Sequence, residues 1–210
     1  PINLPPQLIA PLGPFAAAED ILFSIDLDDY FSDPEGQQLT YQPGFALPAW
    51  LTLDAATGIL SGTPTNDQVG GYELYVLASD SQSGLGLPVT LSVANTNDAP
   101  IDIIGNLRPI PEFVGPGVSV GILGGIDPDV DTLSYSLVND AGGRFAIDAA
   151  TGRVTVANPA LLNFEAANSH VIRVRVTDTS GLSFEENFAS AITDVAETPD
   201  SRTGVSGGIV

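Results

Sequence analysis

The chain of 210 residues contains no cysteine and no lysine. Without cysteine, neither disulfides nor thiolate metal sites can form. A secreted protein of this composition therefore needs another means of stiffening its fold. Six arginines face 26 acidic residues, which gives a formal net charge of −20. Because phosphate binding needs a basic surface, this strongly acidic chain is not expected to bind nucleic acid.

Long apolar runs are also missing. No stretch approaches the roughly 20 residues of a membrane-spanning helix, and no cationic segment precedes an apolar one at the start, so we expect no membrane insertion. The chain begins at Pro1, and we expect it to be a fragment of something longer. Residues 198–210 mix Thr, Ser and Gly without periodicity, which predicts a flexible tail.

Residues that commonly build a catalytic centre are scarce. There is no cysteine nucleophile, and no Ser-His-Asp set can be assigned around His170, the sole histidine. His170 shares strand parity with the core-facing Ile172, which favours a structural role. A carboxylate pair of glycosidase type would have to come from 26 acids, and nothing singles out two of them. We therefore expect a protein that is not an enzyme.

The acidic residues themselves are informative. Eighteen of the 26 are Asp, whose short side chain suits loops that wrap a hard cation with oxygen ligands. The alternative is a solvated acidic surface without a bound ion. With 43% apolar residues in recurrent alternating runs, the chain has enough hydrophobic surface to fold despite its charge.

Two motifs recur at one spacing. Asp33-Pro34-Glu35 returns 94 residues later as Asp127-Pro128-Asp129, and the segment 54–58 returns at the same distance as 148–152. A constant spacing over most of the chain predicts a tandem of roughly hundred-residue domains, a common size for a β-sandwich. The segments 54–58 and 148–152 are hairpin signatures, with Asp bonding backbone N–H groups and Gly tolerating positive φ.

Strand signals dominate both halves. Residues 72–80, 89–93 and 170–178 alternate apolar and polar side chains, which is typical of half-buried antiparallel strands, and no segment shows a sustained helical pattern. Asp80 and Asp178 have the same strand parity as the inward-facing apolar residues that precede them, so both are expected to face inward. An inward carboxylate is costly unless it is hydrogen-bonded or paired with a cation, so each either caps a turn or binds a metal. Matching positions in both halves favour metal.

Short acidic motifs give each half a family resemblance. The second half resembles a cadherin repeat in Pro111-Glu112, Asp127-Pro128-Asp129, Asn163-Phe164-Glu165 and Val176-Thr177-Asp178. The first half resembles the dystroglycan-type cadherin-like variant in Ser32-Asp33-Pro34-Glu35, Leu47-Pro48-Ala49-Trp50 and Gly62-Thr63-Pro64. The resemblance implies an all-β fold of two tandem Greek-key, Ig-like or cadherin-like β-sandwiches. We expect the dystroglycan-type domain at residues 1–97 and the cadherin domain at 98–197.

The cadherin resemblance also implies calcium ligands. At the central junction these are Glu19, Asp67, Asn95, Asn97, Asp98, Asp127, Asp129 and Asp178. Asp33, Glu35 and Asp80 would form a half-site toward a preceding domain, and Glu112, Glu165 and Asp194, with Glu197, one toward a following domain. Asn95 stands where cadherins usually carry Asp, and the first half lacks an obvious Asp-Arg-Glu motif, so we expect one or two central Ca²⁺ ions and weak or empty terminal sites.

The resemblance implies an adhesive role. We expect calcium-stiffened extender modules of a large secreted or cell-surface adhesin, from a bacterium, whose partners are neighbouring cadherin-like domains of the same longer chain. The alternative is a calcium-dependent binding module for carbohydrate or, in a homophilic protein contact, for another cadherin-like domain. Trp50 is expected to be a packed residue, with sugar stacking as the alternative. Tyr30, Tyr41, Tyr72 and Tyr75 show no spacing that favours an aromatic platform.

Overall fold

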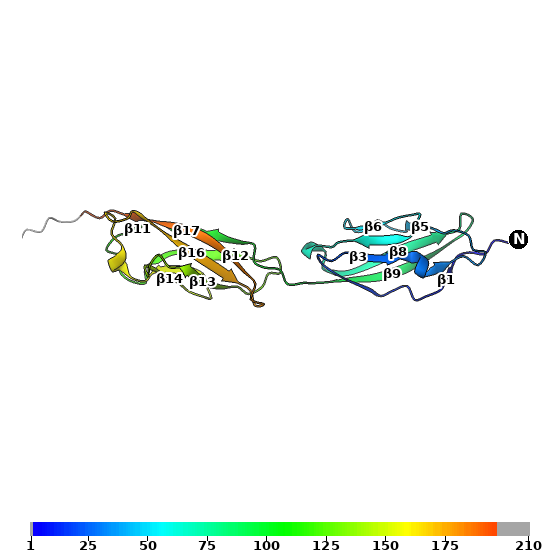
Figure 1. Ribbon diagram of the computed structural model, residues 1–210, viewed down its shortest axis with the longest axis horizontal. Helices are drawn as coiled ribbons and strands as arrows, with labels where there is room; N and C mark the ends of the chain where they lie inside the picture. The colour runs from blue at the N-terminus through cyan, green and yellow to red at the C-terminus, as the bar shows by residue number, and fades with distance from the viewer. Residues whose placement is uncertain (1, 197–210) are drawn as a thin grey trace, which may run out of the picture. The chain divides into compact units, whose positions relative to one another are not determined.

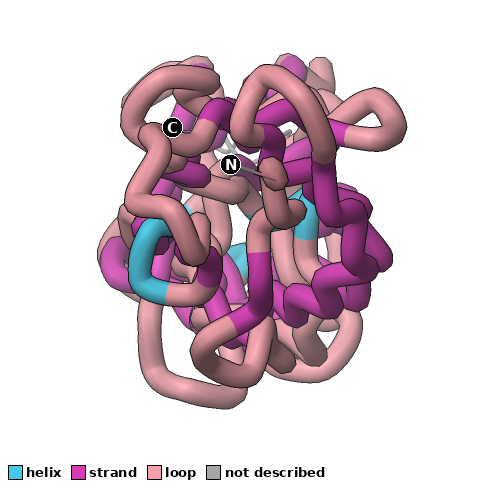
Figure 2. Tube along the Cα trace, turned by 90° about the vertical axis from the view of Figure 1, so that its right-hand side faces the viewer, coloured by secondary structure: helices cyan, strands magenta, loops and turns pink. Residues whose placement is uncertain are grey.

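The computed structural model describes residues 2–196 as strands and loops with three short 3-10 helical turns (Figure 2). The chain divides into two compact units between Asn97 and Asp98, which we call module 1 and module 2. Among the described residues, no helix is long and apolar enough to cross a membrane. The expected flexible tail, and Glu197, lie outside the described residues.

Module 1 is a β-sandwich (Figure 1). One sheet has the strand order β2-β9-β8-β5, a second has β3-β7-β6, and β1 pairs with β4. Strand β2 runs parallel to β9, and all other pairs in this module are antiparallel. The strands are β1 (Gln7–Leu8), β2 (Phe15–Ala18), β3 (Phe23–Asp26), β4 (Phe31–Ser32), β5 (Thr40–Pro43), β6 (Leu51–Leu53), β7 (Ile59–Gly62), β8 (Gly70–Ser79) and β9 (Gly84–Ala94), and the 3-10 turns are η1 (Leu27–Asp29) and η2 (Asn66–Gln68).

Module 2 is a β-sandwich of the same plan (Figure 1). Its two sheets have the orders β10-β12-β15-β14 and β11-β17-β16-β13, and β11 is parallel to β17. The strands are β10 (Asp102–Gly105), β11 (Ile110–Pro111), β12 (Ser119–Ile126), β13 (Ser134–Asn139), β14 (Phe145–Ile147), β15 (Arg153–Val156), β16 (Ser169–Thr177) and β17 (Ser183–Thr193), and the 3-10 turn is η3 (Pro159–Leu161). The two tandem all-β sandwiches expected from the sequence are confirmed.

Each module has its own apolar core between its two sheets. In module 1 the inward residues of β8, Leu74 and Val76, pack with Leu60 of β7 from the facing sheet. In module 2, Ile172 and Val174 of β16 pack in the same way with other buried apolar residues. The alternating pattern therefore favours strands, because every second side chain becomes buried in the core. Burial of apolar surface stabilises the fold by about 25 cal/mol per Å².

The two recurring hairpins are closed in the same way. Asp54 Oδ1 accepts hydrogen bonds from the backbone N–H groups of Ala56 and Thr57, both at 2.9 Å. Gly58 has φ +71°, and a Cβ there would lie 2.7 Å from the ring of Tyr41. Asp148 holds the corresponding turn of module 2 by accepting from the side chain and backbone of Thr151 and from the backbone of Ala150. Backbone hydrogen bonds led by that from Thr57 lower the pKa of Asp54.

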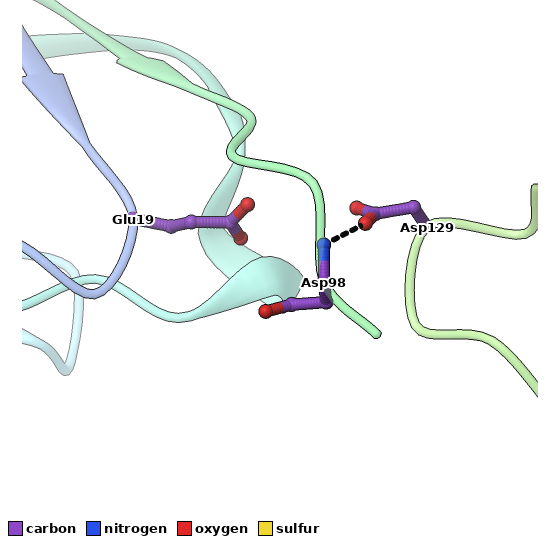
Figure 3. A group of neighbouring side chains, drawn as sticks. All are labelled: Glu19, Asp98 and Asp129. Atoms are coloured by element: carbon purple, nitrogen blue, oxygen red, sulfur yellow. Dashed lines mark hydrogen bonds between the residues drawn. The ribbon is translucent and has the colours of Figure 1, made fainter. Parts of the chain in front are cut away.

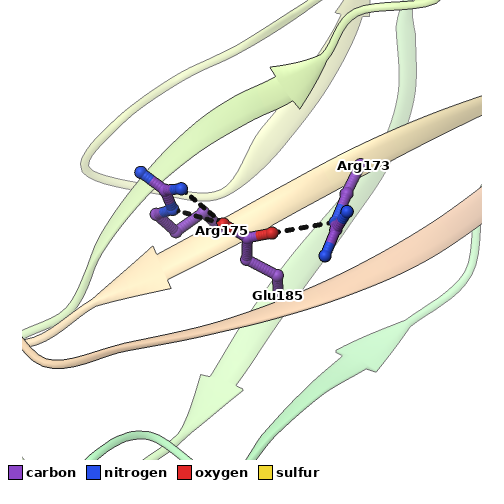
Figure 4. A network of polar contacts seen from close by, with 3 residues as sticks. All are labelled: Arg173, Arg175 and Glu185. Carbon is purple, nitrogen blue, oxygen red and sulfur yellow. Dashed lines mark hydrogen bonds and ion pairs between the residues drawn. The ribbon is translucent and has the colours of Figure 1, made fainter.

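All five described arginines lie in module 2, and module 1 contains no Arg or Lys. Figure 4 shows Arg173 and Arg175 on β16 reaching the two oxygens of Glu185 on β17, with Arg173 Nε 2.8 Å from Oε2 and Arg175 Nε 2.6 Å from Oε1. Both arginine side chains are about half exposed, so the network contributes little to stability. The carboxylates of module 1 have no side-chain cation within their own module.

Candidate metal sites

The acidic residues Asp127, Asp129 and Asp178 form what we call the N-terminal acidic cluster of module 2. Asp127 follows β12, and its Oδ1 accepts hydrogen bonds from the backbone N–H groups of Asp129 at 2.9 Å and Asp131 at 3.3 Å. The loop therefore fixes this carboxylate with its own backbone. Thr179 Oγ1 donates to Asp131 Oδ2 at 3.2 Å, which joins this loop to the one that carries Asp178.

The first residue of module 2 is tied to the same cluster. Figure 3 shows the backbone N–H of Asp98 donating to Asp129 Oδ2, at 2.6 Å. Asp178 follows β16 and is buried, and its Oδ1 accepts from the backbone N–H groups of Ser180 and Leu182 at 2.8 and 2.9 Å. Asp178 therefore caps the following turn with one oxygen, as the alternative to metal binding anticipated.

One oxygen of Asp127 sets this cluster apart from an ordinary set of turns. Its Oδ2 is buried and has no hydrogen-bond partner. A buried carboxylate oxygen without a partner costs free energy, and a cation ligated by that oxygen would remove the cost. The fixed carboxylate and its unpaired oxygen fit a site for an oxygen-liganded cation.

Module 1 has an N-terminal acidic cluster of the same construction, made of Asp33, Glu35 and Asp80. Asp33 Oδ1 accepts from the backbone N–H groups of Glu35 and Gln37, at 2.9 and 3.0 Å, and Asp33 Oδ2 is buried without a partner. The backbone N–H of Leu4 donates to Glu35 Oε2 at 3.2 Å. Each of these bonds has its counterpart 94 residues further along the chain in module 2.

Polar side chains surround Asp80. Asn3 Nδ2 and Ser83 Oγ donate to its Oδ2 at 2.9 and 2.8 Å, and the backbone N–H groups of Gln82 and Ser83 donate to its Oδ1. Burial raises the pKa of Asp80, but these hydrogen bonds, led by that from Asn3, outweigh it and hold the pKa well below its ordinary range. Sequence reasoning missed Asn3, although its position 94 residues before Asn97 was a usable signal.

The third group of acids, the C-terminal acidic cluster of module 2, consists of Glu112, Glu165 and Asp194. One carboxylate oxygen from each lies within 4.8 Å of the other two. Glu112 is buried after β11 and accepts from the backbone N–H groups of Phe164 and Val195, at 2.8 and 3.1 Å, whereas Glu165 and Asp194 are exposed. No side-chain cation pairs with these three acids among residues 2–196. Three like charges at this spacing repel unless a cation or solvent offsets them.

Glu19 is the counterpart of Glu112 in module 1. It follows β2, is fully buried, and its Oε1 accepts a short hydrogen bond from the backbone N–H of Thr96. Its Oε2 is buried without a partner. In module 2 the equivalent second oxygen receives the Phe164 N–H, from the Asn163-Phe164-Glu165 motif that module 1 lacks. The orphan oxygen of Glu19 is a physical consequence of that missing motif.

The remaining expected ligands are Asp67, Asn95 and Asn97. Asp67 is exposed on η2 and Asn95 is exposed just after β9, and neither side chain has a hydrogen bond or ion pair in the described part of the chain. Asn97 is half-buried. A metal role for these three residues stays a prediction.

The aromatic and histidine candidates have packing environments. Trp50 is partly buried, with its ring centroid 6.5 Å from that of Phe23 and 5.9 Å from that of Tyr72. His170 lies at the start of β16 with its ring 6.5 Å from that of Phe145. Burial, followed by the charge of Arg144, lowers the pKa of His170.

Two β-sandwich modules in series, with carboxylates at the ends of their strands, are typical of a tandem of Ig-like and cadherin-like domains. Residues 5–97 match the Ig-domain family He_PIG, and residues 108–192 match the cadherin domain family. The family models thus show an Ig-like domain followed by a cadherin domain, which confirms the tandem of cadherin-like modules expected from the sequence.

Known proteins similar to this chain are cadherins. Mouse Cadherin-24 is 29% identical over 199 residues, which span 81% of this chain but only 25% of that protein. Human protocadherin-24 EC1-2 has a TM-score of 0.68 at 15% identity, covering 90% of this chain and 99% of that one. The extracellular cadherin domains 1-5 of protocadherin gamma B2 give 0.63 at 17% identity, covering 90% and 39%. At these identities the two structures show the fold alone, and the expected bacterial source stays a prediction.

Proposed function

We propose that the two modules are extender units of a larger extracellular or cell-surface adhesin, and that Ca²⁺ bound at the junction stiffens them. The ligands would be Glu19 of module 1 together with the N-terminal acidic cluster of module 2 and Asp98. We propose no catalytic role for these modules. Their partners would be neighbouring modules of the same longer chain.

The observation that carries this proposal is the buried, partnerless Oε2 of Glu19. Module 1 holds Glu19 in place through its first oxygen and the N–H of Thr96, so the second oxygen is oriented by the fold but left without a donor. A metal ion supplies the positive charge that no Arg or Lys of module 1 can supply. The partnerless Oδ2 of Asp127 meets the same description in module 2.

Chain connectivity supports a shared ion. Thr96, which binds Glu19, precedes Asp98 by two residues, and the N–H of Asp98 binds Asp129. The connector, residues 96–98, therefore has one hydrogen bond to an acid of module 1 and another to an acid of module 2. An ion ligated by these acids would restrict the connector and with it the hinge.

The donor set fits calcium better than softer metals. Ca²⁺ takes 6–8 oxygen ligands at about 2.3–2.6 Å, and extracellular modules bind it with a Kd of roughly 10⁻⁴ to 10⁻³ M. Every acid named above offers carboxylate oxygen, and the chain has no cysteine. When bound, the ion would neutralise clustered carboxylates and hold the connector.

The terminal groups are proposed as weaker half-sites. In module 1, the N-terminal acidic cluster offers the buried, unpartnered Oδ2 of Asp33. In module 2, the C-terminal acidic cluster offers three carboxylates within 4.8 Å, two of them exposed to water. Both would gain further ligands from a neighbouring module.

Calcium calorimetry with a matched pair of variants tests the proposal. Glu19→Gln keeps an acceptor for Thr96 but removes the charge, and we expect it to weaken the tightest calcium site strongly. Glu73→Gln makes the same charge change on an exposed residue of β8 and should leave binding unchanged. X-ray scattering with calcium and with EGTA should show a narrower range of interdomain distances in calcium for the wild type. Equal calcium binding by both variants would contradict the proposed role of Glu19.

A further inference from the structure

An aromatic pair sits on the outer face of the β2-β9-β8-β5 sheet of module 1. Tyr75 of β8 faces away from the core, since its neighbours Leu74 and Val76 are buried inward residues. Phe45, just after β5, is 73% exposed, and its ring centroid lies 5.9 Å from that of Tyr75. Two aromatic rings on an outer sheet face, one of them largely in water, need an explanation that core packing does not supply.

Two glycines make room for the Tyr75 ring. A Cβ at Gly44 would lie 2.4 Å from Tyr75 Cδ1, and a Cβ at Gly86 would lie 2.6 Å from Tyr75 Cε1. The ring therefore lies against the backbone of two chain segments, one on each side of β8. Glycine inside a strand weakens it and often marks a close approach, so the sheet gives up some stability to hold this ring against its surface.

A hollow of about 420 Å³ lies further along the same strands, lined by Pro14, Phe15, Gly71, Tyr72, Glu73, Thr90, Leu91 and Ser92. Tyr75 pairs with Pro88, and the next outward pair along the two strands is Glu73 with Thr90, which lines the hollow. One outward step along a strand is about 6.6 Å. The strand register thus places the aromatic pair one outward step from the hollow, and we call this row of residues the outer track: Phe45, Tyr75, Pro88, Glu73, Thr90 and Ser92.

The charge of the outer track contrasts with that of its module. Module 1 has eleven acidic and no basic residues, but among the outward positions of β5, β8 and β9 only Glu73 is charged. The acidic module would repel an anionic ligand. A cationic ligand would have only one carboxylate, that of Glu73, to pair with on this face. The track instead offers apolar ring faces beside the hydroxyl groups of Thr90 and Ser92 and the acceptor Glu73.

We propose that the outer track binds an uncharged oligosaccharide. A sugar ring has an apolar face of C–H groups, which suits the aromatic rings, and hydroxyl groups at its edge, which suit Glu73, Thr90 and Ser92. The hollow lies within the range of about 300–1,000 Å³ that small ligands occupy. No acid of the metal sites takes part, so this binding needs no calcium. Trp50, the aromatic residue first considered for sugar stacking, is instead packed between Phe23 and Tyr72.

The experiment is an NMR titration of the full chain with four neutral hexasaccharides: cellohexaose, xylohexaose, mannohexaose and maltohexaose. We expect at least one to shift backbone resonances of the outer track, equally in calcium and in EGTA. Phe45→Ala and Tyr75→Ala should each weaken that binding by about ten-fold. Phe113→Ala removes an aromatic side chain of module 2 that is 63% exposed, and it should change nothing.

Gly86→Ala gives a test that removes no ligand-binding group. Its new Cβ would push the Tyr75 ring off the sheet, so we expect the same loss of sugar binding with Tyr75 still present. The sugar proposal is wrong if none of the four hexasaccharides shifts the track, or if Phe45→Ala binds as well as the wild type. It is also wrong if sedimentation shows that Phe45→Ala abolishes self-association while no sugar binds, since the track would then join copies of the chain. Failure of calcium binding would leave all of these results unaffected.

Discussion

Replacing Glu19 by Gln should remove most of the stability that calcium gives to the chain. A site bound at a free ion concentration 100-fold above its Kd stabilises the folded state by about 2.7 kcal/mol. For a domain of about 100 residues, this corresponds to a rise in Tm of about 10–20 °C. Glu19 is buried with one oxygen already bonded to Thr96, so the variant keeps that hydrogen bond and loses only the charge and the second carboxylate oxygen.

Calorimetry in millimolar calcium and in EGTA measures the Tm under each condition. The difference between the two Tm values is the stabilisation due to calcium. The wild type and Glu73→Gln should show the full calcium-dependent rise, whereas Glu19→Gln should show little of it. In EGTA, Glu19→Gln should be no less stable than the wild type, because it removes a buried charge that lacks a cation. A full calcium-dependent rise in Glu19→Gln would refute the reasoning, and so would a large loss of stability that is the same in both conditions.

Three further predictions concern stability. Gly152→Ala should destabilise module 2 by roughly 2–4 kcal/mol in urea unfolding, because its Cβ would lie 2.0 Å from the Leu123 carbonyl oxygen at φ +66°; Gly143→Ala, with φ +84° and open space, should cost less. Hydrogen bonds led by that from the Thr151 side chain lower the pKa of Asp148, so its contribution is present above about pH 4 and is lost as the pH falls through the lowered value; acid unfolding of Asp148→Asn should show a weaker pH dependence. Glu185→Gln should change stability by less than about 1 kcal/mol, and less still in 1 M salt, since its arginine partners are half exposed.

The strands with long alternating runs could be predicted from the sequence. Strands β8 and β16 were visible because a period of two places every apolar side chain on one face, and Asp80 and Asp178 then follow at their ends. The break between β3 and β4 could not be predicted from the sequence. There, Asp26 accepts from the N–H of Asp28 at 2.9 Å and caps the turn η1, a local bond that competes with continuation of the strand.

The candidate sites divide in the same way between local and distant contacts. Asp33 and Asp127 are held by backbone groups within four residues, so the loop motif alone predicts their geometry. The bond from Asn3 to Asp80 spans 77 residues, and the contact of Tyr75 with Gly44 and Gly86 joins three chain segments. Neither has a periodic signal, because both depend on which strands become neighbours in the folded sheet.

The bond from Leu4 to Glu35 in module 1 and that from Asp98 to Asp129 in module 2 have a consequence for how such proteins change in length. The peptide N–H group, which every residue except proline provides, makes the attachment at the same place in each copy. The gain or loss of one whole copy therefore keeps this attachment in every remaining copy without any compensating substitution. The length of such a tandem can then change in steps of one domain.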